Sequence, residues 1–154
     1  MNLNTISKLV LGLAVVAFTA TGCKKDECKD KNCGHGTCVD GTCECSAGYE
    51  GSECGTEQRT KFIGSYTGTF SCSGGSPGTV NMTISSSSTG VDKVVMTDGF
   101  DTWVWSVSGS SITIANQTLS GGATLQGSGQ LVGTQLTLNL NISGTTCTYV
   151  GTKQ

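Results

Sequence analysis

The sequence has 154 residues, of which 23 are glycine, nine are cysteine and 13% are charged. Nine cysteines in so short a chain favour an oxidising compartment and argue against a cytosolic enzyme. The formal net charge is −2 and the sequence pI is about 5.2, so the chain lacks the clustered lysine and arginine residues that nucleic-acid binding requires. We expect no nucleic-acid partner. The odd number of cysteines leaves one thiol outside any set of internal disulfides.

The N-terminal residues have the pattern of a targeting segment. Residues 9–18, LVLGLAVVAF, form an uncharged run that has the length of a signal-peptide core and is too short to span a membrane as a helix. Small residues then lead to Cys23, and this pattern resembles the lipobox of bacterial lipoproteins, with Ala20 where the usual lipobox has leucine. The resemblance implies a signal peptide at 1–22 and lipidation of Cys23. A secretory cleavage near Ala20, with Cys23 as a free thiol, is the alternative.

A short charged tether follows the lipobox at 23–27. Its lysine followed by two acidic residues is similar to the export signal of Bacteroidetes-type surface lipoproteins. The resemblance implies a protein that is lipid-anchored in the outer membrane and exposed at the cell surface. The alternative is an ordinary solvated linker, because a motif this short also occurs by chance.

Charge divides the rest of the chain into two regions. Residues 23–61 contain 14 charged side chains among 39, whereas residues 62–154 contain five among 93. Residues 55–61 are polar and show no apolar periodicity, so we interpret them as a linker between two domains. The first region is too short to bury a core and should need disulfides or a metal to hold its fold.

Six cysteines lie in the first region, and their spacing alone does not fix how they pair. Zinc is the competing interpretation, but it prefers close cysteine pairs set apart by a longer loop and is typical of reducing compartments. The run at 28–54 is similar to epidermal-growth-factor-like (EGF-like) modules in its Cys-x-Cys, in its Gly-Tyr-x-Gly corner and in the glycine that precedes the third cysteine by two positions. The resemblance implies the disulfides Cys28–Cys38, Cys33–Cys43 and Cys45–Cys54.

Two features of this module invite a functional interpretation that we do not adopt. His35, the only histidine, lies between two glycines where EGF-like modules often carry a turn residue. A subset of EGF-like modules binds calcium, and Asp26, Glu27 and Asp40 partly match their acidic positions. Lys24 stands where an outer acidic ligand is expected, and Ca²⁺ needs about six to eight oxygen ligands. We therefore expect no bound calcium, no other metal and no cofactor.

The second region has the pattern of β-strands. Residues 62–154 hold 31 serines or threonines and 15 glycines, which alternate with β-branched and aromatic residues at a period of two. This alternation predicts antiparallel strands with one buried and one solvated face, as Leu136, Leu138 and Leu140 illustrate. The spacing predicts about eight strands, at 62–72, 79–86, 91–97, 102–108, 111–116, 123–131, 135–143 and 145–152.

Cysteines near both ends of this region suggest how the strands close. A Cys72–Cys147 disulfide would join the first and last strands if they pair antiparallel, which would close a meander into a barrel without exposed edges. A β-sandwich is the alternative, although Trp103 follows Cys72 by too many residues for the immunoglobulin pattern. The strand pattern and the FxGxY motif at 62–66 resemble the lipocalin-like domains of Bacteroidetes lipoproteins. The predicted fold class is therefore all-β, an EGF-like module followed by an eight-stranded antiparallel barrel.

The residue types argue against catalysis. The second region has Asp92, Asp98 and Asp101 as its only carboxylates, it has no histidine, and it has no Gly-x-Ser-x-Gly motif. Asp98 and Asp101 flank Gly99 and Phe100, and Asp-Gly is foremost a hairpin signal. An enzyme would need an acid–base or nucleophile constellation, so we expect none, and a hydrolase is the least favoured function.

A binding role remains. Tyr66, Phe100, Trp103 and Trp105 could line a barrel mouth for a lipid or glycan, but eight strands enclose an interior that their own side chains can fill. We favour the filled core. The preferred interpretation is a cell-surface lipoprotein that uses an EGF-like spacer to present a barrel to a protein or glycan partner. Small-molecule binding is the alternative.

Overall fold

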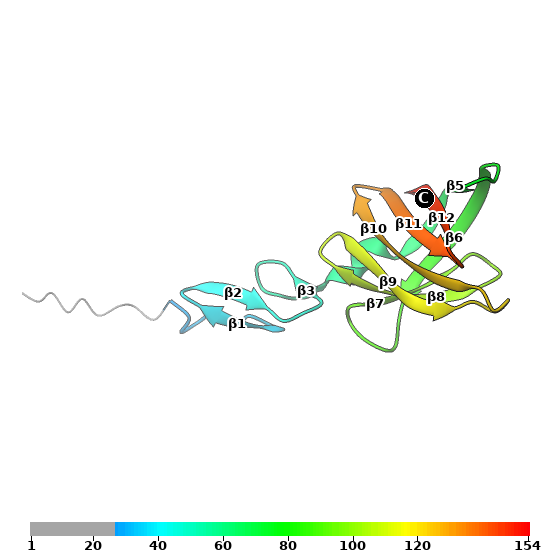
Figure 1. The fold of residues 1–154 in the computed structure, drawn as a ribbon. Coiled ribbons are helices and arrows are strands. Elements are labelled where there is room, and N and C mark those ends of the chain that lie inside the picture. The colour runs from blue at the N-terminus through cyan, green and yellow to red at the C-terminus, as the bar shows by residue number, and fades with distance from the viewer. Residues whose placement is uncertain (1–26) are drawn as a thin grey trace, which may run out of the picture.

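The computed structural model describes residues 27–154, in which a small disulfide-rich module precedes a β-barrel (Figure 1). The predicted signal peptide at 1–22, the lipidation site Cys23 and the tether residues up to Asp26 lie outside the described residues. Over the described part of the chain, no helix has the length and hydropathy needed to cross a membrane.

The module is built from two short hairpins. Strands β1 (Gly36–Val39) and β2 (Thr42–Cys45) pair antiparallel, and β3 (Tyr49–Glu50) pairs with β4 (Thr56–Glu57). Asp40 and Gly41 form the two-residue turn between β1 and β2, and both have positive φ. This is the conformation that an Asp-Gly hairpin turn requires.

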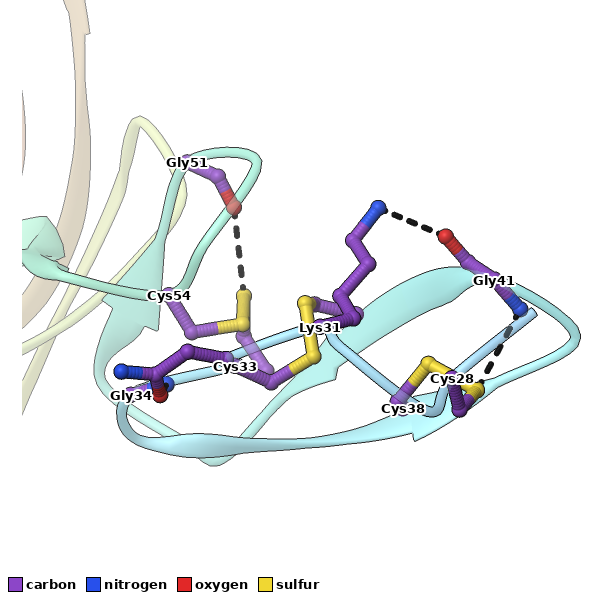
Figure 2. The surroundings of a disulfide bond; sticks show 11 residues. Cys28, Lys31, Cys33, Gly34, Cys38, Gly41, Gly51 and Cys54 are labelled. Carbon is purple, nitrogen blue, oxygen red and sulfur yellow. Dashed lines mark hydrogen bonds between the residues drawn. A yellow bond between two sulfur atoms is a disulfide. The ribbon is translucent and has the colours of Figure 1, made fainter. Parts of the chain in front are cut away.

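Three disulfides hold the module together. They join Cys28 to Cys38, Cys33 to Cys43 and Cys45 to Cys54, which are the pairs that the EGF-like resemblance implies. Around the first of them, Gly41 N donates to Cys28 Sγ and Lys31 Nζ donates to Gly41 O at 2.6 Å (Figure 2). Within residues 27–61, the buried side chains are those of Cys33 and Cys54, so the module has no hydrophobic core of its own.

The remainder of the chain is a closed barrel of eight antiparallel strands, in the order β10-β11-β12-β5-β6-β7-β8-β9. Each strand pairs with its neighbours in sequence, and β12 pairs with β5 to close the circle. The predicted eight-stranded barrel is thus confirmed over the alternative sandwich. The strands are β5 (Gly64–Cys72), β6 (Gly78–Ser86), β7 (Lys93–Thr97), β8 (Thr102–Ser108), β9 (Ser111–Thr118), β10 (Thr124–Val132), β11 (Gln135–Ile142) and β12 (Thr145–Lys153).

Alternating side chains fill the barrel interior. Leu136, Leu138 and Leu140 of β11 are buried, as their alternation predicts, and they join one continuous core with residues of the other strands. Tyr149 of β12 is fully buried, and a Cβ at Gly151 would overlap its ring, so a glycine is needed there. The outward positions are serine, threonine, asparagine and glutamine for the most part, which leaves an uncharged polar wall.

A fourth disulfide lies where the first and last barrel strands meet. Cys72 and Cys147 are direct register partners in the β5–β12 pair and are disulfide-bonded. The bond reinforces a closure that backbone pairing already makes from Cys147 to Lys153. It links residues 75 positions apart in the sequence.

The segment interpreted as a linker at 55–61 is ordered in the structure. Residues 56–57 form β4, and Gln58–Phe62 form a 3₁₀ helix, η1, before β5 begins at Gly64. Phe62, which the strand pattern assigned to β5, lies instead at the end of η1 and is fully buried. The sequence pattern missed this helix because a single 3₁₀ turn shows no apolar periodicity.

Candidate ligand-binding site

The two ends of the barrel differ in the segments of the chain that cover them. At the near end lie η1 and the β6–β7, β8–β9 and β10–β11 turns, and at the far end lie the β5–β6, β7–β8, β9–β10 and β11–β12 turns. We call the opening at the far end the far mouth. The module precedes η1, so it joins the barrel at the near end (Figure 1).

The near end is closed by η1. Phe62 is fully buried in the barrel core, and Tyr66 Oη donates to Phe62 O at 2.9 Å. Gly109 N of the β8–β9 turn donates to Gln58 Oε1 at 2.9 Å, which ties the start of η1 to the barrel. Lys153 Nζ, at the end of β12, donates to Lys61 O at 3.1 Å.

Arg59 is the central contact of this closure. Its Nη1 donates to Ser87 O at 2.6 Å, to Gly90 O at 2.9 Å and to Lys93 O at 3.3 Å, all in or beside the β6–β7 turn. Its Nε forms an ion pair with Glu57 at 2.6 Å, and its side chain is only 12% exposed. The guanidinium of Arg59, which is largely shielded from solvent, therefore links a barrel turn to the end of the module.

The module also touches the barrel directly. A Cβ at Gly48 would overlap Val91 of the β6–β7 turn, so the Gly48 backbone lies against that turn. Gln58 N donates to Gly48 O and Gln58 Nε2 donates to Tyr49 O, and these two bonds hold η1 against the module. The near end is thus occupied by the chain's own residues.

The far mouth is hollow. A pocket of about 480 Å³ lies among the ends of β5, β6, β8 and β11 and the two turns that follow β7 and β9. The wall is mainly apolar, and the two charged side chains that line it are both aspartates. The lining residues are Phe70, Thr79, Val80, Asn81, Met82, Asp98, Phe100, Asp101, Trp103, Leu119 and Ile142.

Trp103 is the largest side chain of this wall that is almost completely buried. It is 5% exposed, and its indole Nε1 has no hydrogen-bond partner within the described chain. A buried N–H without a partner costs free energy, so this indole is a local defect in the packing of β8. Trp105 Nε1 is also unpartnered, but Trp105 is fully buried in the core and does not line the pocket.

Two aspartates shape the rim of the far mouth. Asp98 Oδ1 accepts hydrogen bonds from Phe100 N at 2.9 Å and Asp101 N at 3.0 Å, which folds the β7–β8 turn. Asp101 Oδ1 accepts from Ser120 N at 2.8 Å and from Ser120 Oγ, and these bonds lower the pKa of Asp101. Asp101 is therefore anionic at neutral pH, and it joins the β7–β8 turn to the β9–β10 turn.

The structure divides the four aromatic residues predicted for ligand binding. Phe100 and Trp103 line the far mouth, and Phe100 is 91% exposed on the β7–β8 turn. Tyr66 and Trp105 are fully buried in the core and do not line it. Tyr66 bonds to Phe62 at the near end, and Trp105 lies two residues deeper along β8 than Trp103. Sequence reasoning did not single out Leu119, Val80 or Ile142 as lining residues.

The remaining candidate residues lie in the module. His35 stacks on Tyr49 with ring centroids 3.9 Å apart, so the ring packs against the β3–β4 hairpin. Of the acidic residues that partly match calcium-binding EGF-like modules, Glu27 lies against the Asp40–Gly41 turn, and Asp26 lies outside the described residues. Among residues 27–154, no group of three or more histidine, cysteine, aspartate or glutamate side chains could hold a metal ion.

Comparison with known proteins supports the fold. No protein-family model matches this sequence, and no curated protein matches it. A solved structure described as a redesigned beta barrel is similar, with a TM-score of 0.53 and 15% sequence identity over 63% of this chain and 95% of that chain. At this identity the likeness shows a shared barrel fold and nothing about ligands.

Proposed function

We propose that this chain is a lipid-anchored surface protein that binds a small apolar molecule in the far mouth of its barrel. The observation that carries the proposal is the pocket of about 480 Å³, which is lined mainly by apolar side chains, Trp103 among them. A mainly apolar hollow with a few polar groups is the usual form of a small-molecule site. The core below the mouth is filled, so the ligand would occupy the mouth alone.

The rest of the chain holds this site away from the anchor. The lipobox-like residues up to Cys23 would supply the lipid, and the EGF-like resemblance of residues 28–54 fits a compact, protease-resistant spacer. The spacer meets the barrel at the near end through Arg59 and Gln58. This arrangement leaves the far mouth unobstructed by the described residues of the module.

The role is binding without catalysis. Asp98 and Asp101 both accept hydrogen bonds that hold turns, and His35 is stacked on Tyr49 in the module. A general acid–base pair needs a nucleophile or a proton acceptor within reach of the same reacting atom. We assign the two aspartates to the shape and charge of the rim.

Titration with N-phenyl-1-naphthylamine, a neutral apolar dye, tests the site. We expect saturable binding with one dye per chain. A Leu119→Trp variant should weaken it because the larger ring occupies the mouth. Val132→Trp is the matched control, because Val132 is 68% exposed and lies at the near end of β10. Dye uptake that does not saturate, or that Leu119→Trp leaves unchanged, would contradict the proposal.

The location is tested separately in cells. Protease treatment of intact cells should remove the barrel if it faces outward, and full protection of the barrel would contradict surface exposure. A Cys23→Ser variant should lose its membrane attachment, because lipid chains hold such a protein on the bilayer. A membrane-bound Cys23→Ser protein would exclude the lipid anchor.

A protein or glycan partner on the barrel wall is the second candidate. A shallow hollow on β10 and β11 is lined by Ser128, Gln130, Thr137 and Asn139, which are uncharged hydrogen-bonding side chains. Such a surface suits a polar, uncharged partner. Replacing Asn139 and Gln130 with alanine should abolish binding of such a partner and leave dye binding unchanged.

A further inference from the structure

The charges of the barrel are separated between its two ends. Residues 62–154 contain five charged side chains. Asp92 and Lys93 lie at the start of β7 and Lys153 lies at the end of β12, which places all three at the near end. The remaining two, Asp98 and Asp101, both line the far mouth. No lysine, arginine or histidine lines this pocket.

The acidic rim belongs to a mainly apolar hollow, which is an observation independent of the charge of the rim. Apart from Thr79, Asn81 and the two aspartates, the lining side chains are apolar, and the largest of them, Trp103, is 95% buried. The carboxylates are held in place, because Asp98 accepts from two backbone amides and Asp101 accepts from Ser120. They therefore cannot turn away from a ligand without breaking these bonds.

We propose that the far mouth selects apolar amines over apolar carboxylates. This inference rests on the proposed function and names its ligand class. The apolar body of the ligand lies against Val80, Leu119 and Trp103, and its ammonium group lies at the rim beside Asp98 and Asp101. A carboxylate at the same place meets two like charges and no cation that could neutralise it.

The expected size of this selectivity follows from the partial exposure of the two aspartates to solvent. The two aspartates are partly solvated, so each interacts with a ligand charge through a medium of high effective dielectric constant. Two carboxylates that attract an ammonium and repel a carboxylate should separate the two ligands by about tenfold in affinity at low salt. The ratio should shrink at high salt, because exposed charges are screened.

Displacement of N-phenyl-1-naphthylamine from the full chain tests this selectivity. Decylammonium, decanol and decanoate have the same chain length and differ in the charge of the head group. At about 20 mM ionic strength, decylammonium should displace the dye at roughly a tenth of the decanoate concentration, with decanol between them. At about 0.5 M salt the concentrations at which decylammonium and decanoate displace the dye should become similar.

Two variants locate the effect. The double variant Asp98→Asn and Asp101→Asn keeps the amide oxygens that accept the turn hydrogen bonds, and it should bring the ratio close to one. Asp92→Asn removes an acidic residue at the near end and should leave the ratio unchanged. If the double variant fails to fold, the ratio in the unmodified protein and its decrease at high salt still test the selectivity itself.

The outcomes separate the two proposals. If the dye does not bind saturably, the proposed function fails and the selectivity falls with it. If the dye binds and decanoate displaces it as well as decylammonium does, the site stands and its selectivity for amines is wrong. A ratio near tenfold that persists in the double variant would also overturn the assignment to Asp98 and Asp101.

Discussion

The module and the barrel are stabilised in different ways. In residues 27–61 three disulfides hold short hairpins around two buried cysteines, whereas the barrel surrounds a continuous core from Phe62 to Tyr149 and has one disulfide. A chain held by cross-links can be compact without an interior. A chain that encloses an interior can leave part of it open, so the barrel is the part that can hold a small molecule.

The largest expected effect comes from breaking the disulfides. Each module disulfide closes a loop of about ten residues, and the chain-entropy model assigns somewhat less than about 3 kcal/mol to each. Reduction with dithiothreitol should therefore unfold the module. The barrel also loses its Cys72–Cys147 disulfide, but it keeps its core and its closed strand pairing, so it should be destabilised and remain folded. Hydrogen exchange measured by mass spectrometry would show full loss of protection in 28–54. If the amides of the module stay protected after complete reduction, the module does not depend on its disulfides and the contrast with the barrel is wrong.

Truncation of a core side chain should have the opposite effect to reduction, because it should destabilise the barrel and leave the module folded. Trp105 is fully buried, so Trp105→Ala should destabilise the barrel by about 3–5 kcal/mol through lost contacts and a cavity. Urea unfolding followed by far-UV circular dichroism measures the change. The control Val132→Ala, at a position that is 68% exposed, should change stability by less than about 0.5 kcal/mol. Equal effects of the two substitutions would argue against a packed interior.

A buried phenol makes the barrel sensitive to alkaline pH. Desolvation, with a smaller contribution from Tyr149, raises the pKa of Tyr66 from 10.0 to about 12. The folded state binds this proton more tightly, so the contribution is fully present below about pH 10 and is lost as the pH rises towards 12. Its size is about 2–3 kcal/mol. Tyr66→Phe should remove this part of the pH dependence between pH 10 and 12 in urea unfolding experiments.

The smallest expected effect concerns the joint between the two regions. Arg59→Met should cost about 1–2 kcal/mol, because three carbonyl groups of the β6–β7 turn lose a charged donor. It should also let the module reorient relative to the barrel, which residual dipolar couplings would detect. Lys29→Met, at an exposed module position, is the control and should change neither property. An unaltered alignment in Arg59→Met would show that the other contacts suffice.

The strands were predictable because alternation is a local property of the sequence. Period-two patterns such as Leu136, Leu138 and Leu140 fix which face is buried, and the turns follow from glycine and serine. The 3₁₀ helix at Gln58–Phe62 was not predictable in this way. It depends on Arg59 meeting the carbonyl groups of Ser87, Gly90 and Lys93, which lie far along the sequence.

The site was predictable in part for a related reason. Alternation indicates that Trp103 and Trp105 both point inward, but it does not give their depth along the barrel axis. Depth depends on the register between strands and on which turns lie at each end. For that reason Trp103 lines the far mouth while Trp105 lies in the core, and Leu119 reaches the mouth from a turn.

The two tryptophans provide the most direct test of ligand binding in the far mouth. They give two indole N–H signals in a ¹⁵N-correlated NMR spectrum, which Trp103→Phe would assign. On titration with decanol, we predict that the Trp103 signal shifts and saturates with the dye-displacement curve, while the Trp105 signal moves little. A Trp103 signal that stays in place at saturating decanol, or equal shifts of both signals, would contradict a site in the far mouth.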